Sequence, residues 1–309
     1  MPGGERIFVT AIRQYCARHD IEVDVREDGW LIAMRRGARR HFTLGYDIGV
    51  NSSIAHRLAN DKSATADILA LSGVPCIFHH IFLNPKMGEH IAASGSWDAM
   101  QSLLEQNPQG VVVKPNEGTA GRSVFKVTKR RELELAVGEI FSSYLTLAIA
   151  PFVDIEEEVR VILLDQTPMV VYRKERPSVV GDGRHTLREL SLGFVPGRLN
   201  NLDRSEPEAI VPEGERRALN WRHNLDTGAQ PFLMEQGEGS TACVKIAAAA
   251  VRAIGIDFAA VDVVRSDGAW KVLEINSGVR MEALGARYLD LVCATYAAAL
   301  DRIFNQPSH

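Results

Sequence analysis

Two short segments, far apart along the chain, constrain this protein most. The first is VVVKPNEGTAGRSVFKV (residues 111–127), in which an apolar run ends at Lys114 and a loop with two glycines precedes a second apolar run. The second is VLEINSG (272–278), which places Glu274 and Asn276 two residues apart and therefore on one face of a strand. Backbone N–H groups of such a loop can bind phosphates, and hard oxygen ligands bind magnesium. Together the two segments predict a site for ATP and magnesium.

Length and charge limit the class of protein. A chain of 309 residues is long enough for a large buried core, as one multi-lobed unit or as two domains. Its 35 basic and 39 acidic residues give a net charge of −4, which argues against a general nucleic-acid binder. The basic run Arg35, Arg36, Arg39 and Arg40 has no interleaved aromatic residues. A solvated hairpin is the favoured interpretation of this run, and anion steering is the alternative.

Cysteine usage bears on the location of the protein. The cysteines show no CxxC pair and no regular spacing, which favours reduced thiols over a disulfide framework or a zinc site. They are Cys16, Cys76, Cys243 and Cys293. The first residues, MPGGERIF, contain no apolar signal core, and no window approaches the length of a membrane span. We therefore expect a cytoplasmic protein.

The periodicity of the apolar residues predicts a mixed α+β fold. Helices are expected over 6–18, 63–71 with Ser63 as N-cap, 97–104, 241–254 and near the end of the chain to about 304. Strands are expected over 21–25, 29–34, 111–115, 123–127, 145–153, 159–164, 169–173, 258–264 and 270–275. Residues 194–233 are expected to form an irregular excursion. The turns predict antiparallel hairpins and not the regular alternation of a doubly wound fold.

The functional interpretation of Lys114 competes with a simpler one. An ammonium at the point where a strand meets a loop can hold a phosphate as a point charge. A lysine at a strand end can equally reach solvent. The small polar loop after it favours phosphate, although the loop is not a Walker A motif.

Three polar residues inside late apolar strands form a second candidate set. Asp262 lies in AAVDVV, and Glu274 and Asn276 lie in VLEIN, with the turn SDGA between the two strands. A buried carboxylate needs a cation or a hydrogen-bond partner. Magnesium, held by a few protein oxygens and the nucleotide, is one interpretation. Ordinary buried hydrogen bonds to arginine or backbone are the alternative.

The order of these features resembles the ATP-grasp superfamily, and most closely the ATP-grasp module of cyanophycin synthetases and glutathione-synthetase-like ligases. The resemblance runs from about residue 44 to 278. It includes the segments LGYDIGVNSSIAHRLANDKSATADILALSGVPC, RKERPSVVGDGRHTLREL and LNWRHNLDTGA. It implies an ATP-grasp fold, in which two α+β lobes clamp ATP, preceded by a short N-terminal α/β segment. The implied domains are 1–60 for that segment and 61–309 for the ATP-grasp domain, with a lid lobe over about 74–150 and a catalytic lobe over about 151–305.

The resemblance also implies a set of nucleotide and metal ligands. The phosphates would be bound by Lys62, Lys114 and a loop made of Glu117, Gly118, Thr119, Ala120, Gly121, Arg122 and Ser123. The base would be bound by the hinge Ala150, Pro151 and Phe152, and the ribose by Glu158. The metal would be bound by Asp262, Glu274 and Asn276. Many relatives have a glutamate where this chain has Ala150, so the base contact at that position must come from the backbone or elsewhere.

Arginines are the implied contacts to phosphate and substrate. By position, Arg222 and Asn224 contact the transferred phosphate, and Arg176 joins them as a catalytic residue. Arg173 is a candidate for a substrate carboxylate, because a guanidinium can bind one with two hydrogen bonds. Arg280 is a candidate for a second carboxylate. The histidines His79, His80, His185 and His223 lack metal-ligand spacing and are interpreted as structural or substrate-facing.

The implied activity is an ATP-dependent carboxylate–amine ligase. A substrate carboxylate attacks the γ-phosphate, an acylphosphate and ADP form, and an amine then displaces phosphate to give an amide or peptide bond. The cofactors would be ATP and Mg²⁺, with Mn²⁺ as an alternative, and the partners a small carboxylate and an amine from an amino acid or small peptide. Nucleic acid and membrane are not expected as partners, and a homodimer is considered. The chain lacks the Mur-ligase-like module of cyanophycin synthetases, so a single amide bond is expected. The alternatives are a phosphotransferase and a non-catalytic nucleotide-binding module.

Overall fold

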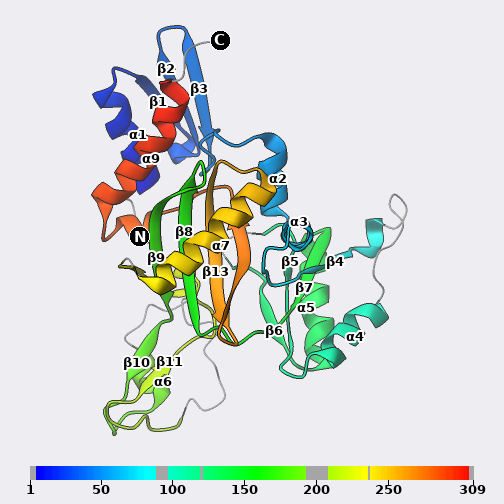
Figure 1. The fold of residues 1–309 in the computed structure, drawn as a ribbon. Helices are drawn as coiled ribbons and strands as arrows, with labels where there is room; N and C mark the ends of the chain where they lie inside the picture. The colour runs from blue at the N-terminus through cyan, green and yellow to red at the C-terminus, as the bar shows by residue number, and fades with distance from the viewer. Residues whose placement is uncertain (1–4, 88–96, 119–120, 193–207, 236, 306–309) are drawn as a thin grey trace. The chain divides into compact units, whose positions relative to one another are not determined.

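The computed structural model describes residues 5–87, 97–118, 121–192, 208–235 and 237–305 (Figure 1). The chain divides into two compact units. The first comprises Met1–Val171 and Glu235–His309, and the second comprises Tyr172–Met234. Strand β9 (Thr167–Glu175) begins in the first unit and ends in the second. The predicted domain boundary at residue 60 differs from this division into units and stays a prediction.

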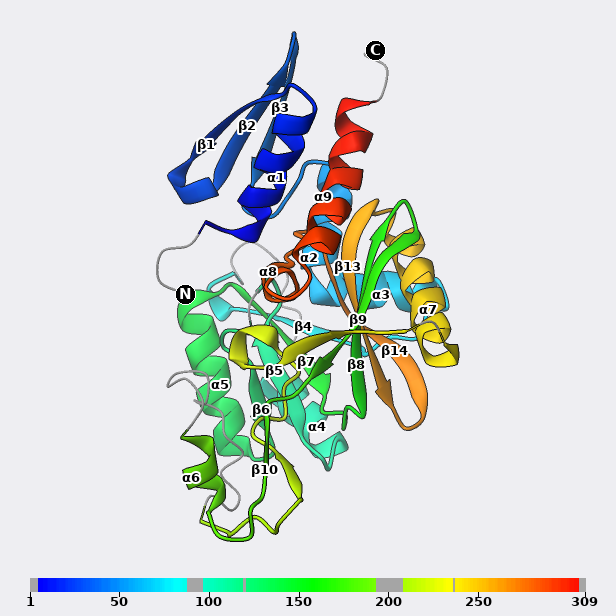
Figure 2. The same cartoon turned by 90° about the vertical axis from the view of Figure 1, so that its left-hand side faces the viewer.

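The N-terminal part of the first unit is a small layer of helix on sheet. Its helix is α1 (Ile7–Arg18), and its antiparallel sheet is β1 (Glu22–Arg26), β2 (Leu31–Arg36) and β3 (Arg39–Leu44), with the short helix η1 (Glu27–Gly29) between β1 and β2. The last helix of the chain, α9 (Leu289–Phe304), lies beside α1, as Figures 1 and 2 both show, and follows the short helix α8 (Glu282–Gly285). The first and last segments of the chain therefore share one core.

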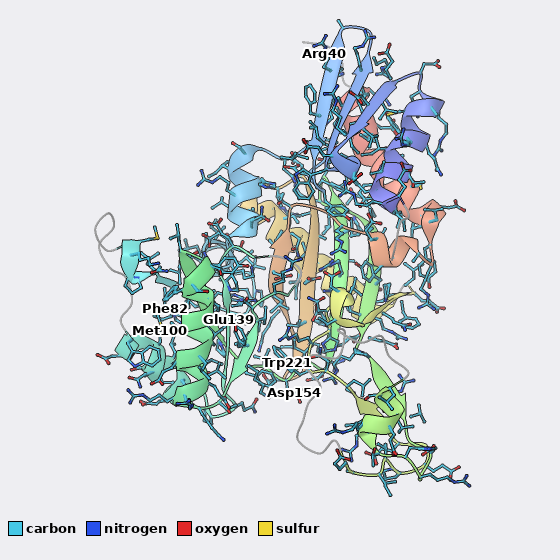
Figure 3. The ribbon with its side chains drawn as sticks, turned by 180° about the vertical axis from the view of Figure 1, so that it is seen from behind. Arg40, Phe82, Met100, Glu139, Asp154 and Trp221 are labelled. Carbon is cyan, nitrogen blue, oxygen red and sulfur yellow. The ribbon has the colours of Figure 1, made fainter. Side chains whose placement is uncertain are left out.

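The basic run lies on the β2–β3 hairpin, where a hairpin was predicted. Arg36 donates a hydrogen bond to the carbonyl of Phe304, and Arg39 donates to the same carbonyl at 3.4 Å. This carbonyl lies at the C-terminus of α9, the electronegative end of the helix. Arg40 is exposed on the same hairpin (Figure 3). Part of the run is thus explained by capping of a helix.

Two short helices lead from this layer to the rest of the unit. They are α2 (Ser53–Asn60) and α3 (Lys62–Leu71). The Asp61 carboxylate caps α3 by accepting a hydrogen bond from the Ala64 N–H at 2.8 Å. The prediction of Ser63 as N-cap is therefore wrong by two residues, because aspartate at 61 satisfies the free N–H groups first.

A four-stranded antiparallel sheet forms the next layer. Its order is β4 (His80–Leu83), β7 (Thr146–Pro151), β5 (Val111–Pro115) and β6 (Phe125–Val127). Helices α4 (Trp97–Gln106) and α5 (Arg130–Ser143) belong to the same layer, and η2 (Pro85–Met87) follows β4. Phe82 and Met100, labelled in Figure 3, pack with Leu133 and Ile140 in one apolar core. The N–H of Lys62 donates to the carbonyl of Asn116, which connects α3 to the end of β5.

The second sheet of the first unit carries the late polar residues. Its strands are β8 (Glu157–Leu164), the start of β9, β13 (Phe258–Ser266) and β14 (Ala269–Asn276), in the order β9-β8-β13-β14. Helix α7 (Glu238–Ile254) packs against β8, β13 and β14 and ends at Gly255, whose φ of 71° suits a glycine. The main chain of Ile77 donates to Val272 at 2.8 Å, so the segment before β4 runs along β14.

The second unit is built from short hairpins. The residues Tyr172–Glu175 of β9 pair with β12 (Gln230–Leu233), and β10 (Ser178–Val180) pairs with β11 (Arg216–Ala218). Helix α6 (Leu187–Ser191) begins at a capping box made by Thr186 and Glu189, and η3 (Leu225–Thr227) precedes β12. The expected irregular excursion therefore contains two short strands and a 3₁₀ turn in its described part.

Two further findings concern the described residues alone. None of their helices combines the length and the apolarity that crossing a membrane requires. The four cysteines are present as free thiols, with Cys16, Cys243 and Cys293 buried.

Candidate functional site

One face of the β8-β13-β14 sheet collects the predicted acidic residues. The strand register places Asp262 between Arg160 on β8 and Glu274 on β14, directly opposite each. Side chains of directly opposite residues point to the same face of a sheet, and so do residues two apart on one strand. Glu158 therefore lies on the face of Arg160, and Asn276 on the face of Glu274. The sheet brings together five polar side chains from three strands.

Asp262 is paired with an arginine. It is 1% exposed, and its two carboxylate oxygens accept hydrogen bonds from Arg160 Nε at 2.7 Å and Arg160 Nη2 at 2.6 Å. This is the two-point geometry of strong guanidinium–carboxylate pairs. The pair satisfies the requirement for a partner that burial of a carboxylate imposes. Arginine as partner was the alternative to a metal in the sequence interpretation.

Glu274 and Asn276 are half-buried and touch each other. Asn276 Nδ2 donates to Glu274 Oε1 at 3.3 Å, which leaves the other carboxylate oxygen and the amide oxygen for another ligand. Among the described residues, no three or more His, Cys, Asp or Glu side chains are grouped as a metal site. The predicted set contains two carboxylates and one amide, a donor set that suits a magnesium ion sharing its ligands with phosphates and water. The oxygen chemistry thus fits, and the role of these residues stays a prediction.

Lys114 is buried at the end of β5, with 8% of its surface exposed. Burial, the largest influence, lowers the pKa of its ammonium to about 8, and the nearby charge of Lys62 acts in the same direction. Glu274, Glu158 and Asp262 oppose this fall in pKa. The solvent-reaching alternative for Lys114 is therefore wrong. Its ammonium lies within the electrostatic reach of the acidic face.

Lys62 holds the start of the glycine loop. Its Nζ donates to the main-chain carbonyls of Asn116 at 3.2 Å and Gly118 at 3.0 Å. Burial lowers the pKa of Lys62, and the acidic neighbours Glu274, Asp61 and Glu117 oppose the change. The side chain of Asn116 accepts a hydrogen bond from the Ser63 N–H at 3.1 Å, which adds a second connection between α3 and the loop.

The rest of the predicted phosphate loop is described only in part. Thr119 and Ala120 lie outside the described residues. Glu117 and Arg122 are exposed, and Gly121 has a φ of 66°. Ser123 has a φ of 49°, and its hydroxyl donates to Glu139 Oε1 at 3.3 Å. Glycine adopts this left-handed region at no steric cost, whereas serine does so rarely.

The hinge predicted to bind adenine is tightly paired through its backbone. Ala150 and Pro151 lie opposite Val112 and Val111 in the sheet. The Phe152 N–H donates to the carbonyl of Gly110 at 3.0 Å, and Lys126 Nζ lies 3.6 Å from the centre of the Phe152 ring. The predicted base contact at Phe152 therefore has to use groups other than this N–H.

Arg280 lies beside the N-terminal layer. Its guanidinium carbon is 5.8 Å from the centre of the Tyr46 ring, and the Tyr46 hydroxyl donates to Glu282 Oε1 at 3.0 Å. Glu282 also accepts hydrogen bonds from the Ile7 N–H at 2.8 Å and the Phe8 N–H at 3.2 Å. Burial raises the pKa of Tyr46, the Glu282 charge raises it further, and Arg280 opposes the rise. The N-terminal segment therefore helps to position Arg280.

The remaining predicted residues belong to the second unit. They are Arg173, Arg176, Arg222 and Asn224. Arg173 pairs with Glu175 at 2.8 Å, and Arg222 lies over the Trp221 ring, 5.2 Å from its centre. Asn224 Oδ1 accepts from the Asp226 N–H at 2.7 Å and so caps a 3₁₀ turn.

Two basic residues of the second unit act electrostatically on a buried histidine. Burial lowers the pKa of His223 to about 3, and the charges of Arg176 and Lys174 add to this effect. His223 is therefore neutral at physiological pH.

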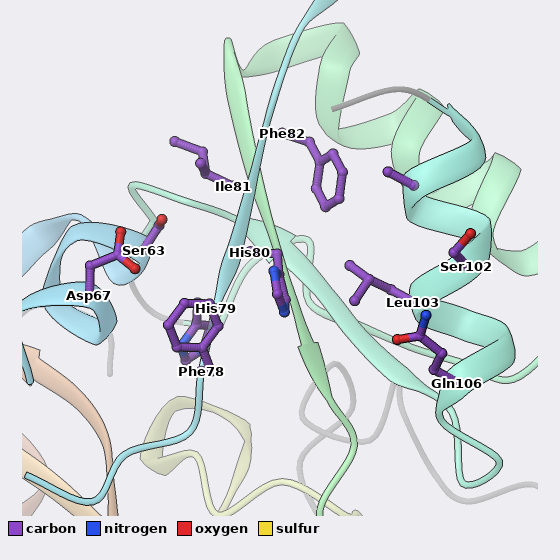
Figure 4. A pocket seen from close by; sticks show the side chains of 11 residues that line it. Ser63, Asp67, Phe78, His79, His80, Ile81, Phe82, Ser102, Leu103 and Gln106 are labelled. Carbon is purple, nitrogen blue, oxygen red and sulfur yellow. The ribbon is translucent and has the colours of Figure 1, made fainter. Parts of the chain in front are cut away.

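A hollow lies beside β4 in the first unit. Its volume is about 570 Å³, and its lining includes Ser63, His79, His80 and Leu103 (Figure 4). None of the residues predicted to bind nucleotide, metal or phosphate lines it, whereas His79 and His80, interpreted from the sequence as structural or substrate-facing, do. Burial lowers the pKa of His79 well below its usual value, and the charges of Lys114 and Lys62 contribute. His79 is thus a neutral, buried side chain within the electrostatic reach of the two lysines.

The comparisons with known proteins decide the fold. No protein-family model matches the chain, and neither does any curated protein sequence. The structure of a bifunctional glutathione synthetase from Pasteurella multocida is similar to this one, with a TM-score of 0.54 and 15% identity. The superposition covers 95% of this chain and 44% of the synthetase chain. A D-alanine–D-alanine ligase from Bacillus anthracis covers 82% of this chain and 71% of its own, with a TM-score of 0.53 and 15% identity.

A third solved structure is that of the ATP-grasp ligase PsnB with a phosphomimetic variant of its minimal precursor, Mg and ADP. It covers 84% of this chain and 61% of its own, with a TM-score of 0.50 and 15% identity. The chain has the ATP-grasp fold. The predicted fold class, a mixed α+β ATP-grasp architecture, is confirmed. The chain spans less than half the length of the bifunctional glutathione synthetase, and at 15% identity the ATP-grasp likeness concerns the fold alone.

Sequence reasoning missed two residues of the site. Arg160 was not considered, although it lies two positions after Glu158 and so shares its face of β8. Asn116, 0% exposed, was treated as one more loop residue, although it follows Lys114 at the same spacing. The two-residue period of a strand could have indicated both.

Proposed function

We propose that this chain is an ATP- and magnesium-dependent ligase that joins a carboxylate to an amine through an acylphosphate. Two observations support the proposal. The chain has the ATP-grasp fold, and the three solved structures named above are of a synthetase and two ligases, one with Mg and ADP bound. The fold also places two ammonium groups, that of the buried Lys114 and that of the half-buried Lys62, near an acidic sheet face, which is the charge pattern that a magnesium–nucleotide complex requires.

The observation that carries the proposal is the position of Lys114. Its buried ammonium interacts with Glu274, Glu158 and Asp262, and also with the neighbouring Lys62. A lysine that only stabilised the fold would not need a second, half-buried lysine beside it, since like charges repel. Two neighbouring cations are explained if the triphosphate, which is a polyanion, binds to both.

The chain's own residues have distinct tasks in the proposed reaction. Lys62 and Lys114 bind phosphate oxygens, and Glu158 binds the ribose. Asp262, Glu274 and Asn276 hold magnesium, which neutralises charge on the phosphates. The side chains proposed to hold the substrate carboxylates and the transferred phosphate are Arg173, Arg176, Arg222, Asn224 and Arg280.

The reaction then consists of two balanced steps. A carboxylate oxygen of the substrate forms a bond to the γ-phosphorus, and the bond from this phosphorus to the bridging oxygen of ADP breaks. An amine nitrogen next attacks the acyl carbon, loses a proton, and expels inorganic phosphate. Positioning and neutralisation of charge supply most of the rate enhancement in such transfers. We further propose a small amino acid or peptide as substrate and the cytoplasm as location.

Incubation of the protein with ATP, Mg²⁺ and pooled amino acids tests the proposal. ADP, inorganic phosphate and a new amide in equal amounts are expected. Hydroxylamine added in place of the amine should trap the acylphosphate as a hydroxamate. ADP with a stable phosphorylated product would instead identify a phosphotransferase, and nucleotide binding without ADP formation would identify a binding module. The Glu274→Gln variant is the matched control, because it keeps the shape of the side chain and removes its charge.

A further inference from the structure

The ion pair between Arg160 and Asp262 occupies a carboxylate that the proposed function assigns to a metal. Both oxygens of Asp262 accept a guanidinium N–H, at 2.7 and 2.6 Å. The Asp262 side chain is 1% exposed and that of Arg160 is 15% exposed, so water screens the pair little. The carboxylate therefore already has a cation of the protein beside it.

A divalent cation at the same place would share this carboxylate. Asp262 lies opposite Glu274, whose partner Asn276 also has an oxygen to offer. A cation bound between Asp262 and Glu274 would lie next to the Arg160 guanidinium. Two positive groups at one buried carboxylate repel each other strongly, because the local dielectric is low.

We propose that Arg160 is a positioning residue that holds Asp262 in the absence of a metal, and that a divalent cation arriving with the nucleotide displaces the guanidinium from this carboxylate. The inference rests on the proposed function. Guanidinium and cation compete for one carboxylate, so the protein alone binds Mg²⁺ weakly. The nucleotide phosphates add the negative charge that favours the divalent cation over the guanidinium at this carboxylate.

The competition can be measured without any enzymatic assay. In Arg160→Gln the buried carboxylate loses the guanidinium that contacts both of its oxygens, so the melting temperature of the metal-free protein should fall. Mg²⁺ without nucleotide should then raise the melting temperature of this variant by more than it raises that of the wild type. By isothermal titration calorimetry, the variant should bind Mg²⁺ at least about tenfold more tightly than the wild type, the scale of one charge-assisted contact.

The double variant Arg160→Gln/Asp262→Asn is the matched control. It removes both charges of the pair and keeps two side chains that can hydrogen-bond to each other. It should melt at a temperature that Mg²⁺ alone does not change. An equal response to Mg²⁺ in the single and double variants would overturn the proposal, because the ion would then bind elsewhere.

A second substitution covers the case in which Arg160→Gln does not fold. Arg160→Lys keeps the charge, but an ammonium cannot contact both oxygens with the geometry of a guanidinium. Its affinity for Mg²⁺ should be higher than that of the wild type, and an unchanged affinity would overturn the proposal. Titration of the wild type with ADP and Mg²⁺ distinguishes a failure of the proposed nucleotide site from a failure of the proposed competition. No binding at all removes the proposed nucleotide site, whereas normal binding with no effect of Arg160 removes only the competition.

Discussion

The ammonium of Lys62 donates a hydrogen bond to the main-chain carbonyl of Gly118 at 3.0 Å, 56 residues further along the chain. A side chain from the first turn of α3 thereby fixes the beginning of the glycine loop. A second bond from the same ammonium, to the carbonyl of Asn116 at 3.2 Å, fixes the preceding turn. The geometry connects a lysine assigned to phosphate binding with the loop proposed to cover the phosphates.

Replacing Lys62 by methionine should loosen this loop and weaken nucleotide binding. The substitution keeps a long apolar side chain and removes the ammonium, whose N–H groups donate to the two carbonyls. Hydrogen–deuterium exchange should become faster in the peptide containing Asn116 and Gly118, and the affinity for ADP with Mg²⁺ should fall. The exposed Lys86 provides the control, since Lys86→Met should change neither quantity. Unchanged exchange in Lys62→Met would mean that the loop does not depend on this contact.

The pKa of Lys114 predicts a pH dependence of nucleotide binding. Burial lowers this pKa from 10.5 to about 8, so the ammonium loses its proton as the pH rises through that value. If only the protonated lysine binds phosphate, affinity for ADP with Mg²⁺ should fall about tenfold between about pH 7 and about pH 9.

The same pKa also affects folding stability. Between about pH 8 and 10.5 the folded protein binds fewer protons than the unfolded chain, so Lys114 destabilises the fold less as the pH rises towards 10.5.

Calorimetric titrations of Lys114→Arg provide the control for this pH dependence. Arginine stays protonated over the whole range, so the decrease in affinity above about pH 8 should disappear in the variant. A wild-type affinity that stays constant over the range would show that Lys114 does not bind phosphate through its charge.

Arg280→Ala should affect one organic substrate and spare ATP. The guanidinium lies beside Tyr46, and a lost charge-assisted hydrogen bond to a substrate carboxylate corresponds to roughly a ten- to a hundredfold change in binding. The KM of that substrate should rise by this factor, with the KM of ATP nearly unchanged. Arg13→Ala, on the exposed side of α1, should leave both constants as they are. A raised KM for ATP alone would place Arg280 in the nucleotide site.

Asn51 is predicted to be a stabilising connection between the N-terminal loop and β13. Its amide donates to the Phe258 carbonyl at 2.8 Å and accepts from the N–H groups of Phe258 at 2.8 Å and Asp257 at 3.1 Å. Asn51→Ala should lower the free energy of unfolding by about 1–3 kcal/mol, because it leaves main-chain groups without partners. Asn305→Ala, which removes one exposed bond to Asp301, should change it by less than about 0.5 kcal/mol. Urea denaturation of both variants measures the difference.

Local patterns allowed part of the fold to be predicted. The strand over 111–115 was predicted with the bounds it has, because an apolar run there ends at a loop signal. The helix Arg130–Ser143 was missed, although Leu133, Ala136 and Ile140 recur at helical spacing. The many charged residues of RRELELAVGEIFSS concealed this short apolar stripe. Helix caps were predicted less well, since Asp61 and Ser63 are both good caps and only the structure distinguishes them.

The candidate site, like the fold, could be predicted only as far as local sequence patterns reach. The two-residue period of a strand was enough to place Glu274 and Asn276 on one face. Arg160 could not be paired with Asp262 from the sequence, because the two residues are 102 positions apart and their contact depends on the register between β8 and β13. Non-local register is set by the packing of whole strands, which a single local pattern does not specify.

ADP formation by Glu274→Ala tests the central claim most directly. Glu274 influences the pKa of both Lys62 and Lys114 and is one of the two carboxylates proposed to hold magnesium. The variant, verified as folded by circular dichroism, should form no ADP from ATP, Mg²⁺ and pooled amino acids. The exposed Glu134 is the matched control, and Glu134→Ala should retain the wild-type rate. A folded Glu274→Ala protein that forms ADP at the wild-type rate would contradict the account.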